Sequence, residues 1–271
     1  MKKFSVVCSY YNRRPQFERT LASISNSSMS DDVEIIVADD GSYDGQRVEE
    51  FIGDFGLDYN VIYMDPHDKW YTNPCIPNNK AISHATGEII ILQNPECFHV
   101  TDILKHTYDN LKETDYFSYG CYSLGKNSAE KFNEIALDED YTESISSFCQ
   151  TLPNSAPVGG TGNDGWYNHT VYRPTGYHFL SAMYKSQMDN LGGFDERYAR
   201  GIGFDDDEFL FRIKLMGLDV KILDQPFCFH QFHYASSSFE RKAANDASLL
   251  TANIRLFQHE TQNSKEWRVN Q

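Results

Sequence analysis

The sequence is short of positive charge. Its 271 residues include 24 lysines and arginines against 39 aspartates and glutamates, which gives a formal net charge of −15. An acidic surface of this kind repels nucleic acid and anionic membranes, so we expect neither as a partner. The same deficit means that a phosphate-bearing substrate must be held by local devices, such as a few well-placed cations or a divalent metal ion.

Long apolar runs and cysteine pairs are missing too. No stretch approaches the ~18 apolar residues of a membrane span, and the apolar start at residues 4–8 stops too early for a signal peptide. The six cysteines form neither a Cys-x-x-Cys pair nor a disulfide framework, so we expect reduced, mostly buried thiols in a cytoplasmic protein. With 40% hydrophobic residues, the composition is nevertheless that of a globular chain with a substantial core.

Strands and helices alternate through the first half of the chain. Apolar runs predict strands at residues 5–9, 34–38, 60–64 and 88–92, with helices after Pro15 and at residues 78–84. The run predicted as the fourth strand, at residues 88–92, is apolar from Ile89 to Leu92, which is typical of a strand buried on both faces of a parallel sheet. The alternation predicts an α/β protein with a single Rossmann-like, mostly parallel sheet flanked by helices.

The second half is less regular. We expect a helix near residues 139–149, a long loop at 153–165, strands at 177–183 and 220–223, and an amphipathic C-terminal helix over 239–258. These elements predict a single domain of residues 1–271. It divides into a first half (1–120), a second half (121–238), and a C-terminal helix and tail (239–271).

Polar side chains follow three of the predicted strands. They are Ser9, Tyr11 and Asn12 after the first strand, Asp39 and Asp40 after the second, and Gln93-Asn94-Pro95-Glu96 after the fourth. Ligands of open α/β sheets bind beyond the carboxyl ends of the strands. An aromatic ring and two carboxylates suit a nucleoside, although the run at 39–42 also fits a simple turn.

Four consecutive carboxylates, at residues 205–208, open a helix in the second half. Acidic residues favour a first helical turn because they meet its free N–H groups and its positive dipole end, so part of this cluster can be a cap. Asp206 lies three residues before Phe209, so we expect it to point toward the interior face of the helix. A carboxylate in that place suits a general base.

Three histidines and one tryptophan are further candidates. His230 and His233 follow a hydrophobic run, and in an extended backbone their odd separation would put them on opposite faces, so we expect only one of them to bind a metal. A lone histidine there can equally be a hydrogen-bonded core residue. Trp166 and His178 are the other two candidates, and ordinary core packing is the alternative for Trp166.

Taken together, these motifs resemble a known family. Ser-Tyr-Tyr-Asn-Arg at residues 9–13, Asp-Asp-Gly-Ser at 39–42, and Pro-Asn-Asn-Lys-Ala at 77–81 with Ala-Thr-Gly-Glu at 85–88 resemble the nucleotide-binding half of the family 2 GT-A glycosyltransferases. The runs at 192–196 and 201–207 are similar to the acceptor half shared with galactosyltransferase-like enzymes. The resemblance spans about residues 4–235. It implies a GT-A fold, a nucleotide-sugar donor, usually a Mn²⁺ or Mg²⁺ ion, and inversion at the anomeric carbon.

The resemblance also implies roles for individual residues. The nucleotide would be held by Ser9, Tyr11, Asn12, Asp39, Asp40 and Asn79, the donor or acceptor sugar would meet Trp166, His178, Gly193 and Asp205, and Asp206 would be the base. Where the family usually has Asp-x-Asp, this chain has Gln93-Asn94-Pro95-Glu96. The implied metal site therefore keeps Glu96 as its carboxylate, with His230 beside it and His233 as the substitute.

The sequence thus predicts an inverting glycosyltransferase that moves a sugar from a nucleotide diphosphate, UDP by resemblance, to a hydroxyl on a glycan or another acceptor. One alternative is a catalytically decayed protein that only binds carbohydrate or nucleotide sugar, because the metal motif departs from the family. Another is a sugar-1-phosphate nucleotidylyltransferase. That class normally needs a glycine-rich, basic loop after the first strand, whereas residues 10–14 contain no glycine.

Overall fold

The computed structural model describes residues 2–137, 141–153, 162–233 and 246–269. The strands are β1 (Phe4–Tyr10), β2 (Val33–Asp39), β3 (Asp58–Tyr63), β4 (Ile89–Gln93), β5 (Cys97–His99), β6 (Asp115–Ser123), β7 (Gly165–Asn168), β8 (Leu180–Tyr184) and β9 (Asp219–His230). The helices are α1 (Arg14–Ser25), α2 (Cys75–Ile82), α3 (Ile103–Asn110), α4 (Lys126–Asn133), α5 (Thr142–Thr151), α6 (Lys185–Leu191), α7 (Asp205–Leu215) and α9 (Ala247–Val269).

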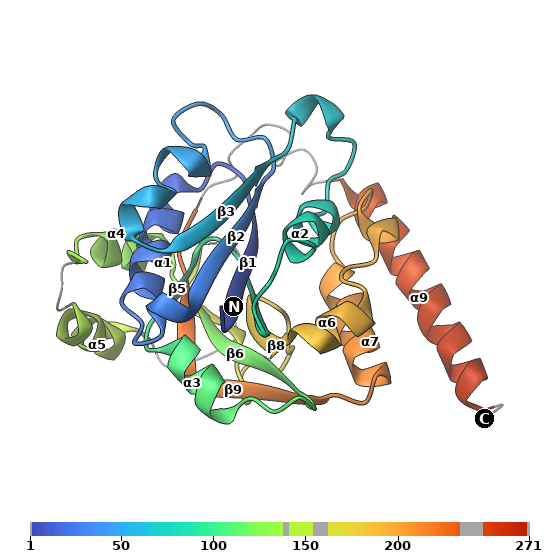
Figure 1. Cartoon of the computed structure of the whole chain (residues 1–271). Coiled ribbons are helices and arrows are strands. Elements are labelled where there is room, and N and C mark those ends of the chain that lie inside the picture. Colours follow the sequence, from blue (N-terminus) through green and yellow to red (C-terminus); the bar gives the residue numbers. More distant parts are fainter. Residues whose placement is uncertain (1, 138–140, 154–161, 234–245, 270–271) are drawn as a thin grey trace.

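All the strands join one sheet, in the order β3-β2-β1-β4-β8-β6-β9-β5, with β7 paired to β6 (Figure 1). The pairs among β1, β2, β3 and β4 are parallel, as are β6 and β9, whereas β8, β5 and β7 run antiparallel to their neighbours. Tyr10 lies opposite Asp39, so β1 and β2 end level with each other. This confirms the predicted α/β sheet and puts the strand-end residues at one edge.

The predicted helix after the first strand is confirmed in detail. Pro15 sits in the first turn of α1, where its missing N–H costs no helical hydrogen bond. Phe17, Leu21 and Ile24 are fully buried on one face of the helix, as their spacing predicts. The predicted buried strand is confirmed as β4, all of whose residues are inaccessible to solvent.

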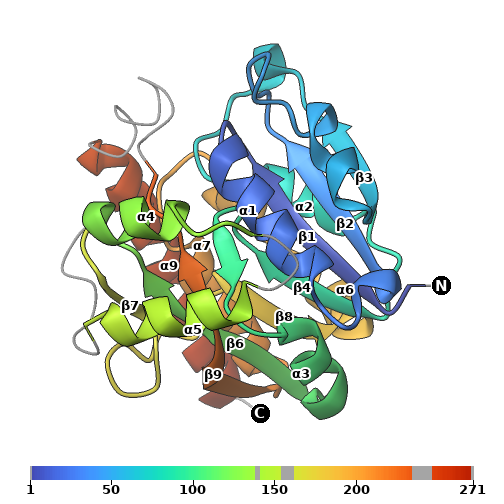
Figure 2. The same cartoon turned by 90° about the vertical axis from the view of Figure 1, so that its left-hand side faces the viewer.

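Helices cover both faces of the sheet (Figures 1 and 2). Phe17 of α1 and Ile103 of α3 pack on one face, and Phe132 of α4 and Phe148 of α5 extend that side. On the opposite face, α2, α6 and α7 form a second core with the strands, which includes Phe209. The six cysteines are free and five of them are buried, as predicted.

The segment before α7 is tied down by the C-terminal helix, which Figure 1 shows at the outer edge beyond α7. Asn253 of α9 is buried, and its side-chain amide donates hydrogen bonds to the carbonyls of Gly203 (2.7 Å) and Tyr198 (3.1 Å). Phe204, the residue before α7, has a φ of 63°, a left-handed conformation that is strained for a large side chain. Its ring packs against Phe257 of α9, so α9 supports a strained backbone at the start of α7.

Several predicted boundaries differ from the structure. The strand predicted at 177–183 begins only at Leu180, and the strand predicted at 220–223 extends from Asp219 to His230 because it pairs along β6 and then β5. The C-terminal helix was predicted over 239–258; α9 spans Ala247–Val269, and residues 239–245 lie outside the described part of the chain. Within that described part, none of the helices combines the length and apolarity that a bilayer crossing requires.

The brace between α9 and the start of α7 predicts a stability effect. Asn253→Ala removes the side-chain donor to the carbonyl of Gly203 and one of the two donors to the carbonyl of Tyr198, so we expect the free energy of unfolding to fall by about 1–3 kcal/mol. Chemical denaturation measures this change. Gln258→Ala, at an exposed position of the same helix, is the control and should unfold like the wild type. Equal stability of the two variants would show that Asn253 does not brace this segment.

Candidate active site

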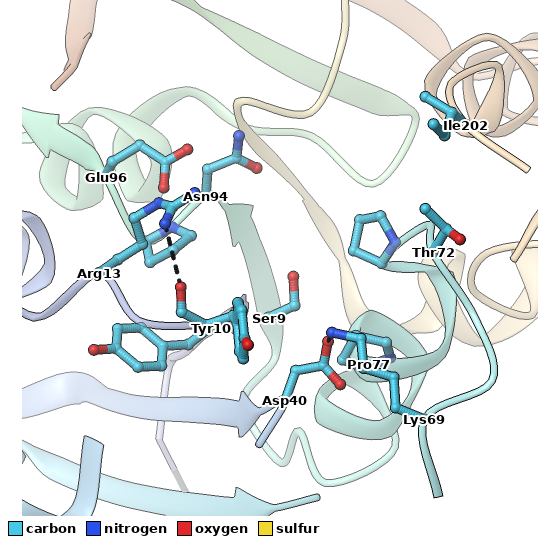
Figure 3. A pocket seen from close by; sticks show the side chains of 13 residues that line it. Ser9, Tyr10, Arg13, Asp40, Lys69, Thr72, Pro77, Asn94, Glu96 and Ile202 are labelled. Carbon is cyan, nitrogen blue, oxygen red and sulfur yellow. Dashed lines mark hydrogen bonds and ion pairs between the residues drawn. The ribbon is translucent and has the colours of Figure 1, made fainter. Parts of the chain in front are cut away.

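A cavity of about 350 Å³ opens at the carboxyl ends of the parallel strands. Its walls come from the loop after β1, the loop after β2, the segment from β3 to α2, and the turn between β4 and β5 (Figure 3). The lining residues are Ser9, Tyr10, Tyr11, Arg13, Asp40, Lys69, Thr72, Pro74, Pro77, Asn94, Pro95, Glu96 and Ile202. This is the position where open α/β sheets bind their ligands.

Asp39 and Asn12 shape the cavity wall from behind. Asp39 is buried, and its carboxylate accepts hydrogen bonds from the backbone N–H groups of Ser42 (2.9 Å) and Val48 (3.1 Å). Burial raises the pKa of Asp39 even though these hydrogen bonds favour the ionised form. Asn12 has a φ of 50° and joins the loops after β1 and β2, because its N–H donates to Ser42 and its side-chain oxygen accepts from Tyr43.

Asp40 faces the cavity together with a cation. Lys69 Nζ lies 2.5 Å from its carboxylate, and the hydroxyl of Tyr71 donates to the other oxygen. Lys69 also lies over the ring of Tyr11, 4.5 Å from its centroid. Lys69 and Arg13 therefore supply positive charge to the wall of a pocket in an acidic protein, as Figure 3 shows.

Glu96 is buried on the opposite wall of the cavity, between two imidazoles. Its Oε1 lies 3.0 Å from Nε2 of His230 and 3.5 Å from Nε2 of His233. Burial alone would raise the pKa of Glu96, but His233 and His230 outweigh burial and hold it well below its usual range. The register explains the meeting, because Cys97 lies directly opposite His230 and Glu96 is the residue before Cys97.

The expectation that His230 and His233 lie on opposite faces was wrong. It assumed an extended backbone from His230 to His233, but β9 ends at His230. The N–H of Gln231 still donates to the carbonyl of Glu96 (3.1 Å), and the imidazoles of His230 and His233 both lie beside the Glu96 carboxylate.

The three side chains fit a divalent metal ion. One carboxylate oxygen and two imidazole nitrogens lie within 4.8 Å of one another, and Nδ1 of His233 is buried without a hydrogen-bond partner in the described residues. Imidazole and carboxylate ligands suit Mn²⁺ and other first-row divalent ions. An ion here would also offset the negative charge that the buried carboxylate brings to the cavity.

The carboxylates at the start of α7 differ in burial and in their side-chain partners. Asp205 and Glu208 are buried, and Glu208 accepts hydrogen bonds from Arg212. Asn73 donates to Asp205 (2.7 Å), and burial together with the charge of Asp206 raises the pKa of Asp205 to about 6. Asp206 retains 30% exposure of its side chain and lies 2.6 Å from Nδ1 of His178. Asp207 accepts a hydrogen bond from Tyr177. The inward carboxylate is thus Asp205, whereas we expected Asp206 to point inward.

The predicted residues that line the cavity are Ser9, Tyr11, Asp40 and Glu96. Among the others, three pack between elements of the fold. The amide of Asn79 bonds the backbone N–H (2.7 Å) and carbonyl (2.9 Å) of Phe194, and it leaves no room for a side chain at Gly193, whose φ is 73°. Trp166 packs edge-on against Tyr122 in a core cluster, while its neighbour Tyr167 faces His230. Asn79 and Gly193 therefore join α2 to the loop after α6, and Trp166 lies on the far face of β7.

Lys69, Tyr71 and Asn73 were not among the residues predicted for the site. All three lie between β3 and α2, and Asn73 connects this segment to Asp205. The backbone N–H groups of Thr72 and Asn73 both donate to the carbonyl of Ala199, which fixes the segment beside the start of α7. The rule that ligands bind after strand ends, applied to the third strand as well, would have found them.

The sheet and the cavity at its carboxyl edge define a GT-A glycosyltransferase, and comparison with known proteins agrees. The model of glycosyl transferase family 2 matches residues 5–163, and the N-terminal domain of galactosyltransferase matches residues 172–234. The chain belongs to glycosyl transferase family 2.

Individual relatives are distant. The uncharacterized glycosyltransferase YfnE of Bacillus subtilis (strain 168) is 24% identical over 265 residues, covering 85% of this chain and 65% of YfnE. TarS from S. aureus superposes with a TM-score of 0.58 at 16% identity, over 85% of this chain and 37% of TarS. The mannosyltransferase PcManGT from Pyrobaculum calidifontis, in complex with GDP-Man and Mn²⁺, gives 0.55 at 16% identity, over 96% and 65%. The chain thus spans less than two thirds of each relative.

The cluster of Glu96, His230 and His233 predicts Mn²⁺ binding that each ligand supports. Glu96→Gln, His230→Asn and His233→Asn should each weaken it at least about tenfold, since even the partners of metal ligands contribute that much. Titration followed by electron paramagnetic resonance measures free Mn²⁺ directly. His259→Asn, at an exposed position of α9, is the control. Unchanged affinity in all three variants would place the ion elsewhere.

Proposed function

We propose that this protein is an inverting, metal-dependent glycosyltransferase that moves a sugar from a UDP-sugar to a hydroxyl on a glycan. The observation that carries the proposal is the convergence of Glu96, His230 and His233 at the wall of the strand-end cavity. Solved structures of TarS 1-349 with UDP and of PcManGT with GDP-Man and Mn²⁺ share the fold, which supports a nucleotide-sugar donor.

The donor would lie across the strand ends. Tyr11 offers a ring for the base, and Ser9 and Asp40 offer hydrogen-bonding groups on the same wall. Asp39 and Asn12 would act by holding the loops that carry these groups. Arg13 and Lys69 would meet the diphosphate, which answers how an acidic protein accepts a dianionic substrate.

A divalent ion held by Glu96, His230 and His233 would supply Lewis-acid stabilisation of the departing diphosphate. Asp206 would receive the proton of the acceptor hydroxyl as its oxygen bonds to the anomeric carbon. The bond from that carbon to the diphosphate oxygen breaks, and its electron pair leaves with the nucleoside diphosphate. Attack from the face opposite the leaving group inverts the anomeric centre.

A panel of nucleotide sugars tests the proposal without knowledge of the acceptor. We expect one UDP-sugar to be slowly hydrolysed with release of UDP, and EDTA to abolish that release. Coupled detection of the released nucleotide reports the rate. Release with none of the UDP- or GDP-sugars, with and without Mn²⁺, would contradict the proposal.

The assignment of the base makes a separate prediction. Asp206→Asn removes the proton acceptor, so turnover should fall by ~10²–10⁴ while the dissociation constant of the donor stays near the wild-type value. Asp207→Asn, in the same helical turn, is the matched control and should retain turnover. Steady-state kinetics and calorimetry together check both parts. Wild-type turnover of Asp206→Asn would remove Asp206 from this role.

The departure from Asp-x-Asp at residues 93–96 favours a second candidate, a protein that binds a nucleotide sugar without transferring it. Calorimetry with UDP-sugars separates the two. Binding without any release of UDP over hours, in the presence of Mn²⁺, would identify the second candidate.

A further inference from the structure

His178 is the one histidine that lies against the acidic start of α7 among the described residues. It precedes β8, is only 7% exposed, and its Nδ1 lies 2.6 Å from Oδ1 of Asp206. That nitrogen is buried, and in the described residues it has no hydrogen-bond partner apart from this contact. Because Asp206 keeps exposed surface, the pair joins a buried ring to a carboxylate that solvent can reach.

The surroundings fix the ring. Its centroid lies 4.8 Å from that of Phe194 and 5.9 Å from that of Phe209, so two apolar faces enclose it. The titratable groups that act on it are Asp206 and, more weakly, Asp205, both on α7. Burial lowers the pKa of His178, but the two carboxylates outweigh burial and the net pKa is raised.

Asp206 itself stands in an unfavourable electrostatic place. Asp205 is the preceding residue, is buried, and has a pKa raised to about 6 by burial and by the charge of Asp206. Asp207 follows and is bonded to the Tyr177 hydroxyl. Asp206 therefore lies between two other carboxylates, and the side chain that lies against it is the ring of His178.

We propose that His178 is a positioning residue for the reaction: its Nδ1 holds one oxygen of Asp206 and orients that carboxylate, leaving the other oxygen for the acceptor hydroxyl. This inference rests on the proposed function of Asp206 as the base. It assigns to His178 a role in proton transfer rather than in sugar contact. The step balances without any further reagent, since the proton passes from the acceptor hydroxyl to Asp206 and no redox change occurs.

The first test needs no activity. In the wild-type protein, the imidazole of His178, assigned by the loss of its signal in His178→Asn, should titrate above pH 6.5 in an NMR pH series. In Asp206→Asn the charge is gone while burial remains, so the same ring should titrate below pH 6.5. An unchanged titration in Asp206→Asn would overturn the pairing, whatever the enzyme transfers.

The second test uses the steady-state kinetics of turnover with the donor that the release assay identifies. His178→Asn keeps a neutral donor near the position of Nδ1, whereas His178→Phe removes it. We expect kcat to fall in both variants, further in His178→Phe, with the KM for the donor unchanged. His106→Asn is the matched control, because Nδ1 of His106 contacts the Tyr119 hydroxyl (3.2 Å) away from the cavity.

The outcomes separate the inference from the function it rests on. An unchanged kcat in folded His178→Phe, with activity still lost in Asp206→Asn, would reject the role of His178 and keep Asp206 as base. Loss of activity in His178→Asn with full activity in Asp206→Asn would make His178 itself the base and overturn the positioning role. Thermal unfolding of each variant establishes that the protein is folded.

Discussion

The site at the carboxyl edge of the sheet depends on one buried charge, the carboxylate of Glu96. Glu96 is almost inaccessible to solvent, and an isolated carboxylate in such a place would be costly. Two imidazoles, from His230 and His233, reduce that cost and hold the pKa of Glu96 well below its usual range. The same arrangement that stabilises the carboxylate also presents three ligand atoms to a cation.

The second half of the chain contributes a different electrostatic arrangement. Here three consecutive carboxylates each have a different side-chain partner. Asn73 donates a hydrogen bond to Asp205, His178 lies beside Asp206, and Tyr177 donates a hydrogen bond to Asp207. The backbone that delivers them is strained at Phe204, and α9 packs against it. The C-terminal helix, remote in sequence, is therefore part of the support of the site.

Periodicity and strand-end motifs were sufficient to predict the main strands and helices of the first half of the chain. The α1 positions Phe17 and Leu21 and the buried strand β4 follow from local pattern alone, because each burial depends on a spacing visible in the sequence. The proximity of Glu96 to both histidines could not be predicted, because it depends on the register of β5 against β9 and on the path of the chain after β9 ends at His230. Likewise, the choice of Asp205 as the inward carboxylate depends on Asn73, 132 residues away.

A motif also does not say what its residues contact. Asn79 belongs to a run typical of the family, and its amide is engaged by the backbone of Phe194. Trp166 packs in a core with Tyr122. In both cases the contact comes from a neighbouring element, and that packing is not local in sequence.

The most direct test of the central claim is a crystal structure grown with UDP and Mn²⁺, with diffraction collected at the manganese absorption edge. We predict one anomalous peak between Glu96, His230 and His233, with the diphosphate of UDP beside it. A peak bound elsewhere, or a diphosphate that lies away from these three side chains, would contradict the account.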